Sequence, residues 1–261
     1  MCRHLAYLGA PCSPAGFLFH APHSLLVQSY APADMRGGGS VNADGFGLGW
    51  YAGGPEPLRY RRVAPLWTDD ALPAIAGSVR THAFVAAIRN GTTGMPVMEQ
   101  ACAPFTDGRW LFSHNGVVRG WPESVAELAS KLPVTDLLTL DAPTDSALLW
   151  ALLRDRLRAG EEPLEAVAEL VLAVERAAPG SRLNLLLTDG ASLLATAWTH
   201  SLAVCETAEG VLVASEPGDP GPHWRPVPDR HAVRVAGGIV EFLSLESPLE
   251  NPEPDRSTRA S

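Results

Sequence analysis

The chain has 261 residues and a formal net charge of −9, with 46% hydrophobic and 19% charged residues. These values are typical of a soluble globular protein with one large domain or two small ones. The negative charge argues against nucleic-acid binding, because neutralising phosphates requires clustered Lys and Arg. No apolar run approaches the roughly 18 residues of a membrane span, and the first segment does not resemble a secretory signal.

The cysteines and histidines give no metal or disulfide pattern. The four cysteines contain no Cys-x-x-Cys pair and are too sparse for a disulfide framework, so we expect a reduced, cytoplasmic protein. His20 and His23 lie in a loop-like segment without completing ligands nearby, which favours solvated or capping roles over metal binding. We therefore expect no metal and no other cofactor.

Short apolar segments separated by glycine and proline make strands the main predicted element. In chain order, the predicted strands are Cys2–Gly9, Leu25–Tyr30, Phe46–Tyr51, Leu58–Ala64, Phe84–Ile88, Trp110–Ser113, Leu183–Thr188, Leu193–Trp198, Leu202–Cys205, Val211–Ala214 and Ile239–Leu243.

Helices are predicted mainly in the middle of the chain. Ser146–Arg158 follows a start signal in APTD, and Pro163–Ala178 carries an apolar stripe with a 3.6-residue period. A third helix is predicted at Asp70–Ala76, although Pro73 interrupts it. Together the elements predict an α+β protein with mainly antiparallel sheets. Ser247–Ser261 has no apolar periodicity and is predicted to be a disordered tail.

The opening letters, MCRHLAYLGA, place a cysteine directly after the initiator methionine. If Met1 is removed, Cys2 offers a thiol together with an α-amino group whose usual pKa of about 8 suits it to act as the base. Position 2 could also be an unimportant tail residue. Motifs further along the chain distinguish a catalytic Cys2 from an unimportant tail residue.

A second motif, RWLFSHNGVV, runs from an apolar strand into Asn115 and Gly116. The Asn115 amide and the Gly116 N–H could stabilise the oxyanion of an acyl-transfer reaction. The alternative is a hairpin turn, because Asn-Gly is a favoured type I′ pair.

Two further positions could recognise an amino acid. Arg89 ends an apolar strand before a Gly/Thr-rich loop, where its guanidinium could hold a carboxylate and the Thr92 hydroxyl could add one bond. Asp145 begins a predicted helix, where it could cap the helix or bind an ammonium group. A solvated arginine and a simple helix cap are the structural alternatives.

In order along the chain, Met-Cys-Arg, NADGFGLGWY, Arg89 with Thr92, SHNG, TDS, LNLLLTDG and ASEP resemble the class II glutamine amidotransferase family of N-terminal nucleophile hydrolases. The resemblance implies a type-2 amidotransferase domain over residues 2–246, folded as a four-layer αββα sandwich. It also implies that Cys2 is the nucleophile, that Asn115 and Gly116 form the oxyanion hole, that Arg89 and Thr92 bind the glutamyl α-carboxylate, and that Asp145 holds the α-ammonium.

The chain departs from the family pattern at two places. Asn90-Gly91 stands where many members have a different sequence between the arginine and the threonine, and Thr93 is a second candidate beside Thr92. Ala147 replaces a glutamate that follows Asp-Ser or Asp-Thr in many ammonia-transferring members. The second departure weakens the case for ammonia transfer.

A narrower resemblance comes from MCRHLAYLG, PHSLLVQSYAP and NADGFG, which are similar to amidohydrolases of ergothioneine biosynthesis. These enzymes hydrolyse γ-glutamyl-hercynylcysteine sulfoxide, which implies thioester catalysis on a small-molecule γ-glutamyl amide. The alternatives are a glutaminase that delivers ammonia to a separate synthase and a non-catalytic binding protein on the same fold. The sequence leaves a homo-oligomer open, and residues 31–45 could be a lid or an ordinary loop.

Overall fold

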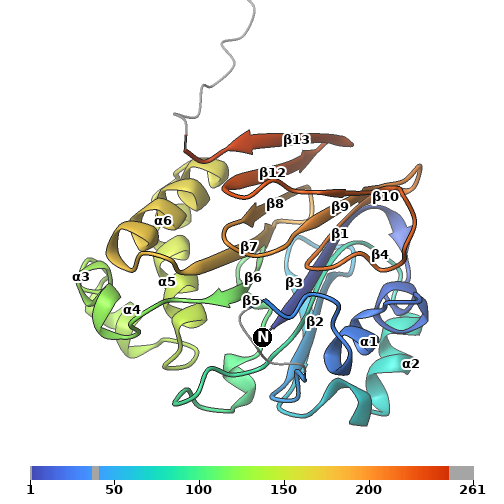
Figure 1. The fold of residues 1–261 in the computed structure, drawn as a ribbon, viewed down its shortest axis with the longest axis horizontal. Helices are drawn as coiled ribbons and strands as arrows, with labels where there is room; N and C mark the ends of the chain where they lie inside the picture. Colours follow the sequence, from blue (N-terminus) through green and yellow to red (C-terminus); the bar gives the residue numbers. More distant parts are fainter. Residues whose placement is uncertain (1, 37–40, 247–261) are drawn as a thin grey trace, which may run out of the picture.

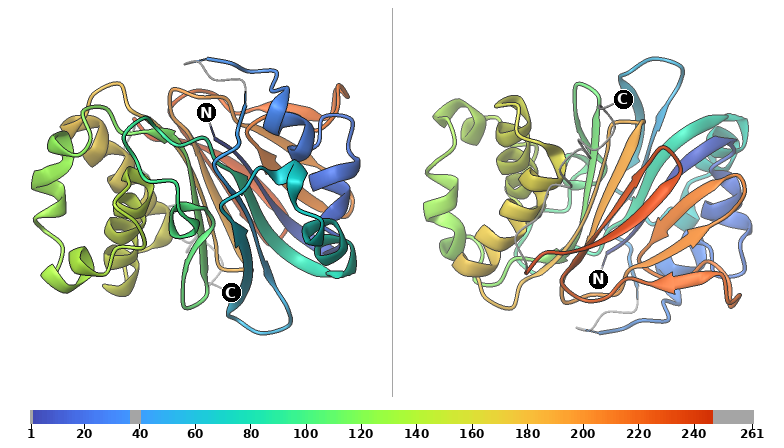
Figure 2. Two further views of the ribbon diagram at one scale, coloured as in Figure 1. Left: turned by 90° about the horizontal axis from the view of Figure 1, so that it is seen from below. Right: turned by 90° about the horizontal axis from the view of Figure 1, so that it is seen from above.

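Two β-sheets lie face to face at the centre of the molecule, and helices cover the outer face of each (Figures 1 and 2). The computed structural model describes residues 2–36 and 41–246. Ser247–Ser261, predicted to be a disordered tail, lies outside the described residues, as do residues 37–40 of the segment 31–45 that could be a lid or an ordinary loop. All strand pairs are antiparallel, so the predicted α+β four-layer αββα sandwich is confirmed.

The first sheet, which we call sheet A, has seven strands among the described residues, in the order β11-β9-β10-β1-β4-β2-β3. Its central strand, β1, begins one residue after Cys2 and is paired on both sides, with β10 and with β4. The strands are β1 (Arg3–Cys12), β2 (Phe46–Tyr51), β3 (Pro57–Arg62), β4 (Thr81–Ile88), β9 (Ala203–Glu206), β10 (Gly210–Ala214) and β11 (Trp224–Pro226).

The second sheet, sheet B, has six strands within the described ranges, in the order β13-β12-β8-β7-β6-β5. The strands are β5 (Phe105–Asp107), β6 (Trp110–Val117), β7 (Arg182–Thr188), β8 (Ser192–Ala197), β12 (His231–Ala236) and β13 (Ile239–Ser244). The sequence interpretation missed β5, β11 and β12. Two of these, β5 and β11, have only three residues, which is too short to produce a clear alternation.

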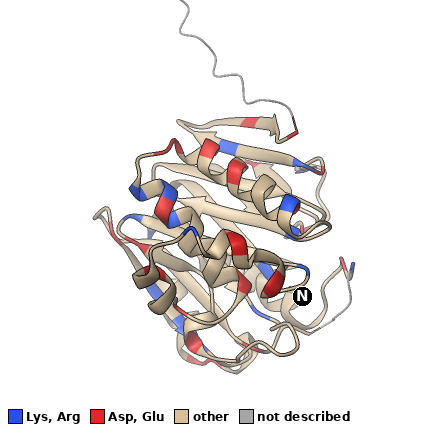
Figure 3. Cartoon of the chain, turned by 90° about the vertical axis from the view of Figure 1, so that its left-hand side faces the viewer, with Lys and Arg blue, Asp and Glu red and all other residues tan. Residues whose placement is uncertain are grey.

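Helices α5 and α6 cover sheet B, with α3 and α4 beside them, while α1 and α2 lie on sheet A (Figures 1 and 2). Acidic and basic positions are interspersed over the helical face formed by α3–α6, as expected for a solvated surface (Figure 3). The α-helices are α1 (Leu25–Tyr30), α2 (Ala71–Ser78), α3 (Ala126–Ala129), α4 (Val134–Leu138), α5 (Asp145–Arg158) and α6 (Pro163–Ala177). Short helical turns are η1 (Gly16–His20), η2 (Leu66–Thr68), η3 (Glu99–Ala101) and η4 (Glu123–Val125).

The described residues form three apolar cores between the four layers. Because successive side chains of a strand point to opposite faces, neighbouring residues enter different cores. In β1, Leu5 and Tyr7 pack toward the helices on sheet A, whereas Ala6 and Leu8 pack between the sheets. The third core lies between sheet B and α5 and α6, where Phe112 stacks on Trp150 with ring centroids 5.3 Å apart. This alternation places His4 on the face of β1 that looks toward sheet B.

The predicted strand at Leu25–Tyr30 is wrong, because this segment forms helix α1. Ser24 caps the helix, with its side chain accepting a hydrogen bond from the Val27 N–H. Six residues are too few for apolar spacing to separate a short helix from a strand, and the serine cap was the better signal.

The Asn115-Gly116 pair does not form a hairpin turn. Both residues lie inside β6 and pair with Asn184 and Leu183 of β7. The predicted strand Trp110–Ser113 therefore ended too early. The hairpin reading relied on local turn preference, which the pairing with a distant strand overrides.

Candidate active site

Cys2 lies immediately before β1, in the middle of sheet A. Its side chain is partly buried, and its Sγ atom lies 3.7 Å from the carbonyl oxygen of Asn90. The thiol lines a small cavity of about 30 Å³ together with Arg89, His114 and Ser146. Cys2 and Arg89 lie at the ends of strands β1 and β4 of sheet A, while β6 and α5 supply His114 and Ser146. The cavity therefore lies between the two halves of the sandwich.

Arg89 directly follows β4 and lies beside the start of β1, because Ile88 pairs with Arg3. Its N–H donates to the Gly45 carbonyl at 2.7 Å, and its own carbonyl accepts from the Asp44 N–H at 3.0 Å. The side chain is 8% exposed, and its NH1 nitrogen is buried without a hydrogen-bond partner in the described part of the chain. Since a buried charged donor without an acceptor is costly, this guanidinium is suited to bind an anionic ligand group.

Asn115 is fully buried in β6, on the face that looks toward sheet A. Its Nδ2 donates to Ser215 Oγ at 3.0 Å, and the same hydroxyl accepts from the His4 N–H at 3.0 Å. These bonds connect Asn115 to the second residue of β1, two positions after Cys2. An amide nitrogen carries two hydrogens, so the second can be donated to a ligand oxygen.

The Gly116 N–H points away from β7. Leu183 and Leu185 direct their N–H groups toward β8, with bonds of 3.1 and 2.9 Å. Because N–H directions alternate along a strand, Asn184, which lies between these two residues, directs its N–H toward β6. Asn184 pairs with Asn115, so the Asn115 N–H points toward β7. Gly116 therefore directs its N–H to the other side of β6, past the end of β5, where it can meet a ligand.

His114 is fixed by two hydrogen bonds on the side of sheet B that faces α5. Its Nε2 donates to the Arg182 carbonyl at 2.9 Å, since a carbonyl can only accept. Its Nδ1 lies 2.9 Å from the hydroxyl of Ser146. The imidazole thus ties β6 to both β7 and α5 at the cavity wall.

Asp145 begins α5 and is only 4% exposed. The helix cap is the preceding Thr144, which accepts from the Ala147 N–H at 3.3 Å, so the simple capping role considered for Asp145 belongs to its neighbour. The Asp145 carboxylate accepts from the Val118 N–H at 3.0 Å and the Ser146 N–H at 2.7 Å. It joins the end of β6 to the start of α5 next to the Cys2 cavity.

Thr92 is exposed and does not line that cavity. It borders a larger groove of about 620 Å³, together with Met95, Arg119 and Trp121. The structure therefore brings Arg89 to Cys2 but places Thr92 at a separate groove.

Two polar residues near Cys2, the buried His4 and the half-buried Arg182, were missed by the sequence interpretation. His4 Nδ1 lies 3.1 Å from Ser113 Oγ, and burial, followed by the charges of His114 and His200, holds the pKa of His4 well below its usual value. Arg182 has a buried Nε without a partner among the described residues, and burial lowers its pKa while the nearby Cys2 thiolate would raise it. Such residues carry no sequence signal because their contacts are long-range.

His23 contacts the carboxylate of Glu216, with Nε2 2.6 Å from Oε2. Among the residues described, no group of three or more His, Cys, Asp or Glu side chains could hold a metal ion. None of the helices in the described ranges is long and apolar enough to cross a membrane.

The paired sheets, the cavity at the start of β1 and the buried guanidinium define one protein class. Residues 12–209 match the family model for class II glutamine amidotransferases, and the chain belongs to this family. It is 41% identical over 246 residues to the gamma-glutamyl-hercynylcysteine sulfoxide hydrolase of Mycolicibacterium smegmatis, an alignment that covers 94% of this chain and 100% of the relative.

Solved structures agree with this assignment. A glutamine aminotransferase class-II domain protein from Silicibacter pomeroyi superposes with a TM-score of 0.67 at 26% identity, covering 93% of this chain and 99% of that one. The glutamine phosphoribosylpyrophosphate amidotransferase of B. subtilis gives a TM-score of 0.66 at 12% identity, covering 94% of this chain and 49% of that one. The second likeness shows the shared fold alone.

Proposed function

We propose that this chain hydrolyses the γ-glutamyl amide of γ-glutamyl-hercynylcysteine sulfoxide, releasing glutamate and hercynylcysteine sulfoxide in ergothioneine biosynthesis. The main support is the 41% identity to a relative that is named for that activity, in an alignment that covers 94% of this chain and 100% of the relative. The convergence of a thiol and a buried guanidinium on one cavity supports the same chemistry. A small-molecule substrate and a cytoplasmic location are parts of this proposal.

The glutamyl end would bind as a zwitterion. Arg89 would receive the α-carboxylate, which supplies the acceptor that its buried NH1 lacks. Asp145 would attract the α-ammonium from the start of α5, where its carboxylate already accepts two backbone N–H groups. Thr92 can add a bond to the carboxylate only if its loop moves toward the cavity, because Thr92 borders a separate groove.

The reaction would use Cys2 as nucleophile after removal of Met1. The free α-amine takes the thiol proton, and the sulfur forms a bond to the γ-carbonyl carbon. Asn115 Nδ2 and the Gly116 N–H stabilise the oxyanion, a role worth roughly 2.7–4 kcal/mol for one donor. The C–N bond breaks as the amine passes its proton to the leaving nitrogen. Water then hydrolyses the thioester and releases glutamate.

The test is glutamate release from the γ-glutamyl conjugate and from glutamine, with intact mass to verify loss of Met1. We expect a higher kcat/KM for the conjugate, and no turnover by Cys2→Ala. Cys12→Ala is the matched control, because Cys12 lies at the other end of β1. A preference for glutamine would favour the ammonia-delivering alternative. Turnover by Cys2→Ala would refute the thioester mechanism, and retention of Met1 without turnover would favour a binding protein.

A further inference from the structure

A buried ion pair lies directly behind the nucleophile. Arg3 Nε and Glu216 Oε1 are 2.5 Å apart, and their side chains are 1% and 2% exposed. Arg3 is the first residue of β1, and Glu216 follows β10, the strand that pairs with β1. The pair thus fastens the beginning of the strand that carries Cys2.

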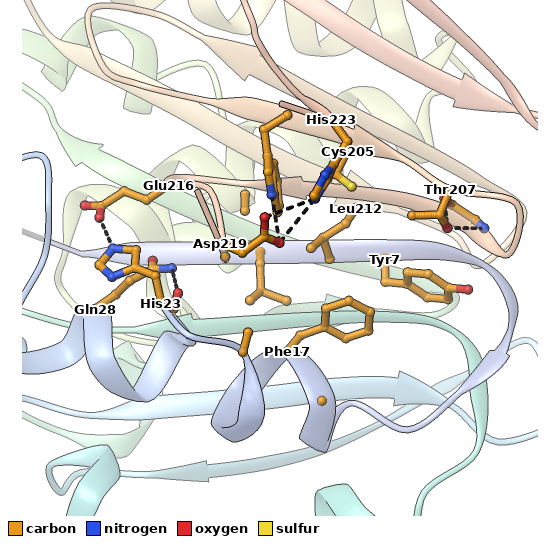
Figure 4. A pocket seen from close by; sticks show the side chains of 17 residues that line it. Tyr7, Phe17, His23, Gln28, Cys205, Thr207, Leu212, Glu216, Asp219 and His223 are labelled. Atoms are coloured by element: carbon orange, nitrogen blue, oxygen red, sulfur yellow. Dashed lines mark hydrogen bonds and ion pairs between the residues drawn. The ribbon is translucent and has the colours of Figure 1, made fainter. Parts of the chain in front are cut away.

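The carboxylate of Glu216 is held by further donors. It accepts hydrogen bonds from the backbone N–H groups of Ala33 and Asp34 at 2.8 and 3.2 Å, and His23 Nε2 lies 2.6 Å from it. Figure 4 shows the contact between His23 and Glu216, and the bond that the Gln28 amide donates to the backbone beside it. Burial opposes ionisation of Glu216, but these bonds and the charge of Arg3 outweigh it and lower its pKa to about 2. Both carboxylate oxygens are therefore committed.

Arg3 also holds the backbone of the nucleophile itself. Its NH1 donates to the Cys2 carbonyl at 2.9 Å, and its NH2 donates to the Asp34 carbonyl. The guanidinium is a rigid planar fork, so fixing Nε on Glu216 also fixes the position of NH1. The orientation of the peptide between residues 2 and 3 is thereby tied to Glu216.

Arg3 acts from the side of β1 opposite to the reaction. Side chains alternate along a strand, so Arg3 shares the face of Leu5 and Tyr7, which pack toward the helices on sheet A. His4 occupies the other face and contacts Ser113 of sheet B. The guanidinium is therefore placed to orient Cys2 without contacting substrate.

We propose that Arg3 is a positioning residue whose guanidinium, held by Glu216 and His23, sets the orientation of Cys2 for attack on the γ-carbonyl. This inference rests on the proposed function. It gives a joint role to three separated pieces of sequence, Cys2-Arg3, Pro22-His23-Ser24 and Ser215-Glu216. An Arg–carboxylate pair of this kind adds little net stability compared with apolar packing, but it can fix a geometry.

The test compares Arg3→Lys, Arg3→Met and Glu216→Gln in steady-state hydrolysis of the γ-glutamyl conjugate. A lysine cannot reach both Glu216 and the Cys2 carbonyl with a planar fork, so Arg3→Lys should not rescue activity. We expect kcat to fall on the order of 10²-fold, as for other small misplacements of reacting groups, while KM stays within about threefold. Arg225→Met is the matched control, because it breaks an exposed ion pair with Glu206 in the same sheet.

The rate at which iodoacetamide alkylates Cys2, followed by mass spectrometry, provides a readout that does not need the substrate. If the wild type does not turn over the conjugate, the proposed function fails, while a changed alkylation rate in Arg3→Lys still supports positioning. If the Arg3 variants do not fold, His23→Gln carries the test, because His23 is 21% exposed and contacts Glu216 from outside. Folded variants with wild-type kcat and alkylation rate would overturn the proposal.

Discussion

The imidazole of His114 passes directly over the α-carbon of Gly116. A Cβ atom at residue 116 would lie 2.5 Å from His114 Nε2 and would overlap the Arg182 carbonyl oxygen, the two atoms joined by a hydrogen bond. Glycine is therefore required here for close approach. An unusual φ angle, the other reason for a glycine, does not apply because residue 116 is not among the positive-φ positions.

We predict that Gly116→Ala destabilises the fold and reduces turnover together. The methyl group must displace the His114 imidazole or the β7 backbone, which costs about 1–3 kcal/mol as overpacking. It also moves the N–H proposed to stabilise the oxyanion. Thermal unfolding and glutamate release measure the two effects. Gly77→Ala in α2 is the control, since a Cβ there meets nothing within 4 Å, and an equal loss in both variants would contradict the argument.

Arg89→Met should weaken binding of the glutamyl group without unfolding the protein. A hydrogen-bonded charge partner is worth about 1.5–3 kcal/mol, so we expect KM to rise roughly 10- to 100-fold. The buried NH1 has no partner among the described residues, and its removal should leave thermal stability nearly unchanged. The comparison variant is Arg80→Met, which changes an exposed arginine directly before β4. If KM changes little in Arg89→Met, Arg89 does not bind the glutamyl group.

We expect Arg182→Met to lower kcat/KM for the conjugate more than kcat/KM for glutamine. The scissile nitrogen of the conjugate belongs to a cysteine that carries a carboxylate, and the Arg182 Nε near Cys2 lacks a partner in the described structure. We expect kcat/KM for the conjugate to fall about tenfold or more, the effect of about 1.5 kcal/mol from one charged hydrogen bond, while kcat/KM for glutamine changes little. Equal losses for both substrates would assign Arg182 a purely structural role.

Acid should destabilise the fold through buried histidines. Burial, with the charge of Arg3, lowers the pKa of His200 to about 4, and the pKa of His4 is also lowered, chiefly by burial. Both are neutral in the folded and unfolded states above the usual pKa of about 6.5. As the pH falls from about 6.5 toward 4, both histidines become protonated in the unfolded state but stay neutral in the folded state. Stability then declines by up to about 1.4 kcal/mol per pH unit for each group.

Urea unfolding between pH 7 and 4 measures this decline. His200→Asn should reduce the slope, because an asparagine oxygen can replace Nδ1 as the acceptor of the Ser201 N–H, which donates at 3.0 Å, without titrating. His20→Asn, at an exposed position, should keep the wild-type slope. Identical slopes in all three proteins would exclude His200 as a source of the acid sensitivity.

The long periodic elements were predictable from the sequence, and the short or long-range ones were not. Pro163–Ala178 differs from α6 by one residue, because a proline start and a regular apolar stripe are local signals. Leu25–Tyr30 was assigned the wrong type, and β12 was missed although it pairs with both β8 and β13. Pairing of that kind depends on strands distant in sequence, which local patterns do not reveal.

The candidate site shows the same division. Cys2 and Arg89 were chosen from motifs, and the structure brings both to one cavity. Their catalytic and binding roles stay predictions. Arg3 and Glu216 lie within the sequence motifs, but the sequence predicts no role for them, because their contact spans 213 positions of sequence. Thr92 was selected by offset from Arg89, and offset alone does not determine where a loop side chain lies.

Chain ends usually fray first, because they are tied down on fewer sides than the interior of a domain. Here the proposed nucleophile directly precedes β1, the strand that lies between β10 and β4. Cys2 itself lies just before the ladders, which begin at Arg3 on the β4 side and at Leu5 on the β10 side. Displacing the strand that directly follows Cys2 would open both ladders, so we expect heat or denaturant to abolish the nucleophile geometry and the tertiary structure in a single transition.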